Sequence, residues 1–297
     1  MSELHAVHQD GIVSIYEGST LLARYHARTP ASKPYFDVVA LPAGAGEIAG
    51  RNLALAAPHD HVWHLGLFFC QKMIDGINCW ESEILAHRNR LHGRAEHVDL
   101  EVDSGASPAV GFTHTAKWVS SEGEELVLDR RRITIRPPQG DSYFIVWEQA
   151  LEALSHRRHL SSETIHGHYS GLSYRALRSM TGGRILLRDG EYRGSGPAPR
   201  SPWCDLSGGL DGSPVFGRPY RAGIAMMYDP GHSEDEMAWF AMNQPFSFIS
   251  ANPTYERVLS VDPANPVTWR WGVWVHAGTP DAAQIEEAYK RFCGLLS

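Results

Sequence analysis

The chain has 297 residues, of which 43% are hydrophobic and 21% are charged, and its formal net charge is -7; this is the composition of an ordinary globular protein. The negative charge and the lack of a basic block argue against a nucleic-acid partner, because phosphate binding needs clustered Lys and Arg. No apolar stretch approaches the roughly 18 residues of a membrane-spanning helix, and the N-terminus lacks the features of a secretory signal, so we expect a cytoplasmic protein without membrane contact.

Alternation of apolar and polar residues with a period of two runs through the first half of the chain and is typical of half-buried strands. Residues 11–18 and 20–27 predict an opening hairpin, and residues 61–82 predict a strand, a turn at Asp75-Gly76 and a second strand. The other predicted strands of this half lie at 35–42, 94–105, 109–120, 124–138 and 141–154.

The second half continues the pattern, with Gly and Pro clusters between the strands. Its predicted strands lie at 171–180, 183–190, 222–230, 236–243, 245–251 and 268–278. Only residues 279–297 predict a helix, with Thr279 as a candidate N-cap and Pro280 at the first helical position. The buried stripe expected for this helix consists of Ala283, Ile285, Ala288, Tyr289 and Phe292.

About fifteen short strands in one chain predict an all-β fold built from stacked antiparallel sheets. We expect a large two-layer β-sandwich with a C-terminal helix, because no blade repeat indicates a propeller. No linker divides the sequence, so residues 1–297 are interpreted as one domain. The four cysteines lack CxxC spacing and are expected to be free thiols of a reducing compartment; they are Cys70, Cys79, Cys204 and Cys293.

Three histidines gather in the segment "PHDHVWHLGLFF", at His59, His61 and His64. On a regular strand the first two side chains would share one face and His64 would point the other way, whereas a turn or bulge would bring the three together. The cluster has three interpretations: metal ligands, proton carriers for a substrate, or hydrogen-bonded residues of a core.

A second histidine pair, His166 and His168, lies close to Glu163. Two such pairs with a carboxylate are a possible mononuclear metal site, as in a cupin-like enzyme. The cupin pattern has a Glu shortly after the first pair, but here the next acid is Asp75. A divalent metal is therefore one alternative, and no other cofactor is expected.

The other functional interpretation is sugar chemistry without a metal, because histidine exchanges protons near neutral pH and aromatic rings suit the faces of a sugar. Glu148 lies in the apolar segment "FIVWEQA", where a carboxylate needs a partner or a role, and we consider it a candidate catalytic residue. Arg175 is expected either to pair with a buried acid such as Glu148 or to bind a substrate oxygen. The candidate substrate-binding residues are Asp60, Trp63, Trp80, Glu81, Tyr169, Arg175, Trp203, Asp205, Asn243 and Asn252.

Several motifs together resemble the PmoA-like family, a domain labelled "methane oxygenase PmoA". They are "PHDHVWHLGLFF", "DGINCWES", "HYSGLSYRAL", "SPWCDLSG", "AGIAMMYDP", "WFAMNQPFSFISANPTY" and "WRWGVWVHAG", and the resemblance spans about residues 20–278. Asp60, His61 and His64 match the first family motif, whereas Trp63 and Leu65 replace a His and an Arg, so the roles of those two family positions are not carried over.

The resemblance implies a fold and a substrate class. Methane oxidation by the membrane enzyme needs a bilayer-spanning segment, which this sequence lacks. The family is similar to the galactose-mutarotase-like sandwiches, which bind sugars on a concave sheet and use His with a carboxylate as acid and base. Its members tend to accompany sugar dehydrogenases, which implies a role in carbohydrate catabolism.

We therefore predict an enzyme that performs proton transfer on a sugar or keto-sugar: epimerisation, β-elimination or hydration. His61 and His64 are the predicted proton carriers, supported by His59 and Asp60. His166, His168 and Glu148 are predicted to complete the catalytic set. The alternatives are a non-catalytic carbohydrate-binding protein and a metal-dependent cupin-like enzyme; a homodimer is the suggested assembly.

Overall fold

The computed structural model describes residues 3–104, 108–162, 169–211, 220–232 and 236–295. In this part of the chain the strands form two antiparallel sheets of nine strands and a small sheet of four. In spatial order, the first large sheet consists of β1 (Leu4–Gln9), β2 (Ile12–Glu17), β3 (Thr20–His26), β4 (Tyr35–Val39), β5 (Leu67–Cys70), β13 (Gly171–Arg175), β20 (Phe248–Asn252), β19 (Ala238–Met242) and β16 (Gly196–Ala198).

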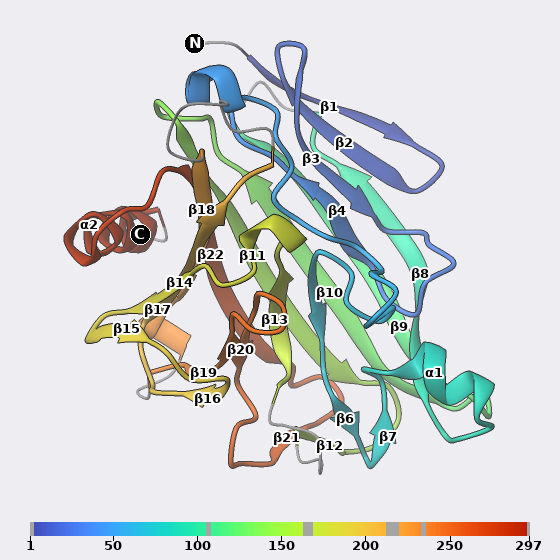
Figure 1. The fold of residues 1–297 in the computed structure, drawn as a ribbon. Helices are drawn as coiled ribbons and strands as arrows, with labels where there is room; N and C mark the ends of the chain where they lie inside the picture. The colour runs from blue at the N-terminus through green and yellow to red at the C-terminus, as the bar shows by residue number, and fades with distance from the viewer. Residues whose placement is uncertain (1–2, 105–107, 163–168, 212–219, 233–235, 296–297) are drawn as a thin grey trace.

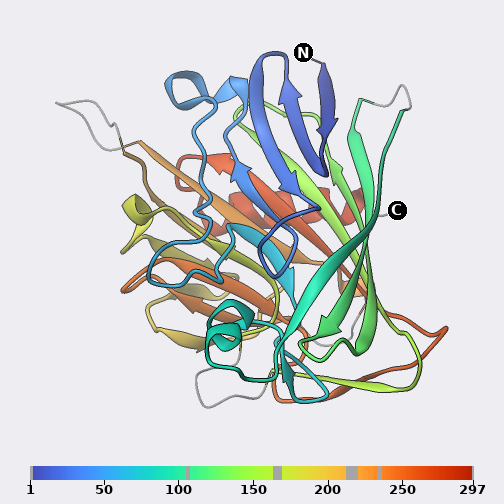
Figure 2. The ribbon, with the colours of Figure 1, turned by 90° about the vertical axis from the view of Figure 1, so that its right-hand side faces the viewer.

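The second large sheet contains the longest strands of the described chain and faces the first (Figures 1 and 2). Its order is β15 (Gly190–Tyr192), β14 (Arg184–Leu187), β17 (Trp203–Gly209), β18 (Arg221–Tyr228), β22 (Val267–Ala277), β11 (Ser142–Ala153), β10 (Glu125–Ile135), β9 (Val110–Ser120) and β8 (Gly93–Val102). The small sheet consists of β21 (Leu259–Val261), β12 (Arg158–Ser161), β6 (Met73–Ile74) and β7 (Ile77–Asn78). The short helices are α1 (Ser82–His87) and the 3₁₀ segments η1 (Ala43–Ile48), η2 (Arg178–Met180) and η3 (Pro230–His232).

The core lies between the two large sheets, as shown by aromatic contacts that join them. Phe36 on β4 packs against Trp147 on β11 with ring centroids 6.0 Å apart, and Phe69 on β5 packs against Trp271 on β22 at 5.8 Å. The predicted all-β sandwich is confirmed, and so is the opening hairpin, which forms β2 and β3. The four cysteines are free, three of them buried and Cys293 half-buried.

The C-terminal helix α2 (Ala282–Gly294) covers the outer face of the second sheet, beside β18 and β22 (Figure 1). Strand β11 therefore has two apolar faces: Trp147 points into the sandwich, whereas Phe144 and Val146 point towards the helix. Ile285, Ala288, Tyr289 and Phe292 form the buried side of α2 as predicted, but Ala283 is exposed. No helix of the described residues is long and apolar enough to cross a membrane.

The predicted N-cap of this helix is wrong by two residues. The helix begins after Asp281, whose Oδ1 accepts a hydrogen bond from the backbone N–H of Gln284 at 2.9 Å. The Gln284 side chain in turn accepts from the Asp281 N–H at 2.9 Å, which completes a capping box. Thr279 lies outside the helix and instead accepts a hydrogen bond from Arg221.

This cap supplies a test of the helix terminus. Asp281→Ala should lower the free energy of unfolding by about 1 kcal/mol, because one N–H of the first turn loses its acceptor. Asp281→Asn keeps a side-chain oxygen and should stay close to the wild type. Urea unfolding of the two variants measures the difference, and equal losses would contradict a capping role.

A buried polar network crosses the space between the sheets. Asp129 and Arg131, neighbours on the inner face of β10, are both fully buried and pair at 2.7 Å. Arg131 also donates to the hydroxyl of Tyr25 on β3 at 3.3 Å, and this hydroxyl lies 2.9 Å from Nδ1 of His114 on β9. His114 Nε2 lies 3.2 Å from Nδ1 of His97, near the surface. His114 is buried, and this network satisfies both of its ring nitrogens.

Candidate functional site

The three clustered histidines lie on two successive turns, not on the predicted strand. The His61 N–H donates to the Pro58 carbonyl at 3.0 Å, and the His64 N–H donates to the His61 carbonyl at 2.9 Å. The strand begins only at Leu67, after Gly66. Gly66 has a positive φ of 75°, and a side chain there would collide with the backbone of Phe36, so glycine is needed where the turns enter the sheet.

The turns stack His61 on His64, with ring centroids 4.9 Å apart and planes 24° from parallel. His64 is buried and also stacks on Phe248 at 4.6 Å, whereas the His61 side chain is about one-third exposed (33%). His59 is exposed and accepts a hydrogen bond from Arg178 at 3.1 Å. The structure thus brings the two predicted proton carriers, His61 and His64, together and places the supporting residue His59 at the surface beside them.

Arg175, the last residue of β13, fixes this arrangement. Its guanidinium is fully buried; it donates to Asp60 Oδ2 at 2.9 Å and to His64 Nδ1 at 3.2 Å. It also lies 3.6 Å from the centre of the Phe246 ring, a cation–π contact. The predicted pair of Arg175 with Glu148 is wrong. Glu148 lies on β11, on the other large sheet, and its nearest cation is Arg270 at 3.9 Å.

The charge of Arg175 sets the protonation of its neighbours. Burial raises the pKa of Asp60, but the hydrogen bond and charge of Arg175 outweigh it and hold that pKa at about 2. Burial and the same guanidinium bring the pKa of His64 well below its usual value. Because an arginine can only donate, His64 Nδ1 is an acceptor, and the proton of this neutral imidazole lies on Nε2. Burial also lowers the pKa of His61, against the opposing charge of Asp60.

His61 and His64 line a pocket of about 880 Å³. The same pocket is lined by Lys72, Glu81 and Tyr169, which contact one another. Lys72, just after β5, forms an ion pair with Glu81 and donates to the Tyr169 hydroxyl at 3.3 Å; that hydroxyl donates to Glu81 Oε1 at 2.9 Å. These three residues come from the end of β5, the start of α1 and the segment before β13, so three distant parts of the chain meet in one group.

Glu81 and Tyr169 of this group differ in their protonation. Burial raises the pKa of Glu81, but the charge and hydrogen bond of Lys72 prevail and lower it overall. Burial and the adjacent Glu81 carboxylate raise the pKa of Tyr169. An ionised carboxylate and a protonated phenol are therefore held side by side at neutral pH. Glu81 Oε2 is buried, and no hydrogen-bond donor among the described residues satisfies it.

Aromatic and apolar side chains form the rest of the lining. Trp63 meets His61 edge to face at 5.0 Å, and its buried indole N–H has no acceptor in the described part of the chain. Trp80 is fully buried behind the pocket, 6.3 Å from His64 and 4.9 Å from Tyr169 (ring centroids). The remaining lining residues include Met73, Ile84, Leu85, Phe240, Met242, Pro245, Phe246 and Phe248.

Other residues predicted for the site lie elsewhere. Trp203 packs under α2 and donates its indole N–H to Glu286 at 2.9 Å. Asp205, on the second large sheet, is fully buried and pairs with His276 at 2.9 Å. Asn243 donates to the Gly183 carbonyl at 2.7 Å. None of these side chains is among the described residues that line the pocket of His61.

Asn252 is buried at the end of β20, where its side-chain oxygen accepts from the N–H and hydroxyl of Thr254 at 3.0 and 3.1 Å. His166, His168 and Glu163 lie outside the described residues. Within the described ranges, no group of three or more His, Cys, Asp and Glu side chains has the geometry to hold a metal ion.

Sequence reasoning missed three cations of the pocket lining: Lys72, Arg88 and Arg90. Lys72 follows an apolar strand in "FFCQKM", where a lysine ordinarily marks the return to solvent. Arg88 and Arg90 lie in "AHRNRLHG", which has the composition of an exposed turn. The available signal was indirect: Glu81 follows the apolar segment "INCW", and a carboxylate buried there needs a cation.

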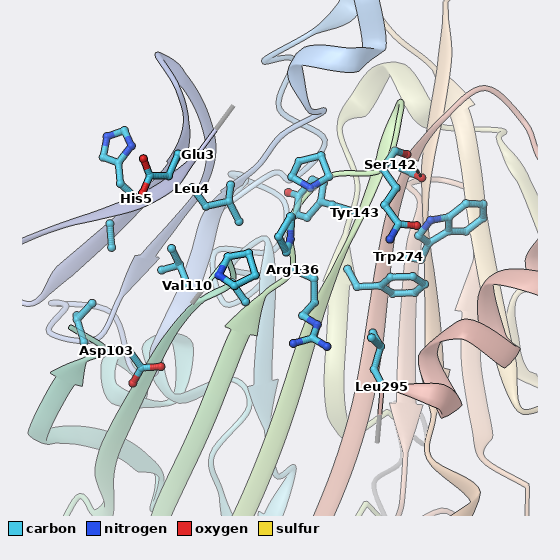
Figure 3. Close-up of a pocket in the computed structure, with 18 of the residues that line it drawn as sticks. Glu3, Leu4, His5, Asp103, Val110, Arg136, Ser142, Tyr143, Trp274 and Leu295 are labelled. Carbon is cyan, nitrogen blue, oxygen red and sulfur yellow. Dashed lines mark hydrogen bonds between the residues drawn. The ribbon is translucent and has the colours of Figure 1, made fainter. Parts of the chain in front are cut away.

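A second pocket, of about 970 Å³, lies between β1, the ends of β9 and β11, and the C-terminal helix (Figure 3). Its charged side chains are mainly at the surface: Asp103 pairs with Arg132, and Arg291 donates to Gln139 at 3.0 Å. The described lining holds no two acid–base groups that contact each other, so the pocket of His61 is the better candidate for chemistry.

Comparison with known proteins gives a family without a function. No curated protein matches this sequence. The model of a family of unknown function, DUF6807, matches residues 13–290. This span includes the second large sheet, the first large sheet apart from β1 and the first residue of β2, and every described residue of the His61 pocket. The chain therefore belongs to DUF6807, a family of unknown function.

Proposed function

We propose that this protein is an enzyme of carbohydrate catabolism that binds a sugar or keto-sugar in the His61 pocket and moves a proton at a carbon next to a carbonyl. Epimerisation, β-elimination and hydration share such a proton transfer. The observation that carries the proposal is the meeting, in one pocket, of two stacked neutral imidazoles with the Lys72–Glu81–Tyr169 group.

The stacked imidazoles and the Lys72–Glu81–Tyr169 group suit different roles in proton transfer. His61 is part-exposed and its pKa is lowered, so at neutral pH it is a free base able to accept a proton. Tyr169 has a raised pKa and is a proton donor, with Glu81 ionised beside it. Pairs of titratable groups whose pKa values are pushed apart are typical of acid–base sites. His64, held by Arg175, offers its Nε2 proton to a substrate oxygen.

A sugar substrate is supported by the lining. Aromatic rings beside a few convergent polar groups suit a molecule with one apolar face and many hydroxyls. The resemblance to the PmoA-like family and to galactose-mutarotase-like sandwiches points to the same class, although fold likeness alone does not determine function.

A metal-dependent version of the reaction would use the imidazoles as ligands that polarise a carbonyl. His61 and His64 would then need further ligands, for which His166 and His168 are the sequence candidates. A divalent metal, a cytoplasmic location and a homodimer stay predictions from the sequence.

Solvent exchange measured by NMR tests the proposal. In D₂O the wild type should replace the proton next to the carbonyl of at least one keto-sugar in a broad panel, and His61→Gln should slow this exchange by about 100-fold or more. His156→Gln, an exposed histidine outside the pocket, is the matched control and should exchange at the wild-type rate.

Binding measured in parallel separates the rival function. A carbohydrate-binding protein would bind sugars with similar affinity before and after His61→Gln and would catalyse no exchange. That result, or exchange that His61→Gln leaves unchanged, would contradict the proposed role.

A further inference from the structure

The lining of the His61 pocket carries an excess of positive charge. Its cations are Lys72, Arg88 and Arg90, and Glu81 is the only carboxylate among the described residues that line it. Lys72 is neutralised by Glu81, so the two arginines are the excess. A positive pocket on a chain with a net charge of -7 is a local feature that attracts an anion from solution.

Neither arginine has a partner among the described residues that neutralises its charge. In the described ranges, no hydrogen bond or ion pair involves the guanidinium of Arg88 or Arg90. The arginine that follows in the chain behaves differently: Arg94, outside the pocket, pairs with Glu96 at 2.7 Å. Both free guanidiniums are exposed at the pocket and are available to a ligand.

The backbone places the two arginines on one tight turn at the pocket wall. Arg88 caps the C-terminal end of α1, and the N–H groups of Arg88 and Arg90 both donate to the Leu85 carbonyl, at 3.1 and 3.0 Å. Asn89 between them adopts a positive φ of 51°, which closes the turn. Leu85 itself lines the pocket, so the turn is anchored to the pocket wall.

We propose that the substrate is a sugar acid, whose carboxylate binds Arg88 and Arg90 at the mouth of the pocket while its ring lies against His61 and Tyr169. This inference rests on the proposed function and names its substrate class. A guanidinium presents a planar fork of donors that matches a carboxylate. A phosphate ester offers a guanidinium the same kind of oxygen acceptors, so a sugar phosphate is the competing ligand that the experiment must separate from a sugar acid.

Paired ligands test the proposal on the full chain. Galacturonate and glucuronate are compared with galactose and glucose by isothermal titration calorimetry at low salt. The wild type should bind at least one acid roughly tenfold or more tighter than its neutral counterpart, and Arg88→Gln/Arg90→Gln should remove about that factor for the acid while leaving the neutral sugar unchanged. The control Arg94→Gln/Arg130→Gln removes the same charge outside the pocket, from surface pairs, and should keep the preference.

Two outcomes would overturn this inference alone: equal affinity for acid and neutral sugar, or an acid preference that the double variant retains. Tighter binding of galactose 6-phosphate than of galacturonate would also contradict the assignment of a carboxylate. The proposed function fails differently, when sugars bind and the arginine effect is seen but no member of either series undergoes proton exchange.

Discussion

Replacing Asp129 by Asn should lower the free energy of unfolding by about 3–5 kcal/mol, although the side chain keeps its size. The Asp129 carboxylate accepts hydrogen bonds from Trp118 at 2.9 Å, Gln149 at 2.5 Å, and Arg131 at 2.9 and 2.7 Å. An amide would turn an NH₂ group towards some of these donors and leave Arg131 without a counter-ion. Arg131 is fully buried, so water cannot replace the lost charge.

The control for this variant is Asp103→Asn, which removes the carboxylate partner of Arg132. Both side chains of that pair are about two-fifths exposed (42% and 39%), and the expected loss is below about 1 kcal/mol because water screens the pair. Chemical denaturation of the two variants gives the comparison. Losses within about 1 kcal/mol of each other would show that the buried network contributes no more than a surface ion pair.

The sequence pattern did contain a signal for this network. Period two on β10 places Asp129 and Arg131 on the same face as Val127, Ile133 and Ile135, all of which are buried. The opposite face carries Arg130 and Arg132 and is the more exposed one. On the inner face the opposite charges of Asp129 and Arg131 neutralise each other and so tolerate burial. Local alternation predicts which side chains share a face; whether a charged pair on that face is buried depends on what the opposite sheet supplies, here Tyr25.

In the candidate site, too, the sequence indicates which residues matter but not which residues they contact. Asp60, His61, His64, Glu81 and Tyr169 could be selected from sequence because polar residues in apolar surroundings need partners. The partners themselves could not be assigned: Arg175 binds Asp60 across more than a hundred positions, which only the pairing of β5 with β13 makes possible.

Residues with similar neighbours in the sequence lie in different parts of the fold. Trp203 and Asp205 share the aromatic and acidic character of Trp80 and Glu81, yet they lie on β17, in the second large sheet. Composition and spacing carry no information on which sheet a strand joins, because that choice is made by long-range pairing. For the histidine segment the sequence left a strand and a turn as alternatives, since His-x-His alternation looks the same in an extended segment and in two consecutive turns. The structure has the turns.

Acidification should destabilise the protein through buried histidines before its carboxylates titrate. Burial, together with the charge of Arg131, lowers the pKa of His114 to about 3, whereas the unfolded chain has a histidine pKa near 6.5. At pH 5 the unfolded state takes up this proton and the folded state does not, so acid favours unfolding. The stabilisation is complete above about pH 6.5 and is lost as the pH falls towards 3.

His114→Gln isolates this contribution, because glutamine can still accept the Tyr25 hydroxyl proton but does not titrate. Between pH 7.5 and 5 the wild type should lose about 2 kcal/mol more of its free energy of unfolding than the variant. The buried imidazole of His64, whose pKa is also lowered, is present in both proteins, so its effect cancels in the difference. Urea unfolding of both proteins at the two pH values measures this difference in stability loss. Parallel losses would mean that His114 becomes protonated within the fold, which would require the Tyr25–His114–His97 chain of hydrogen bonds to open beside the charge of Arg131.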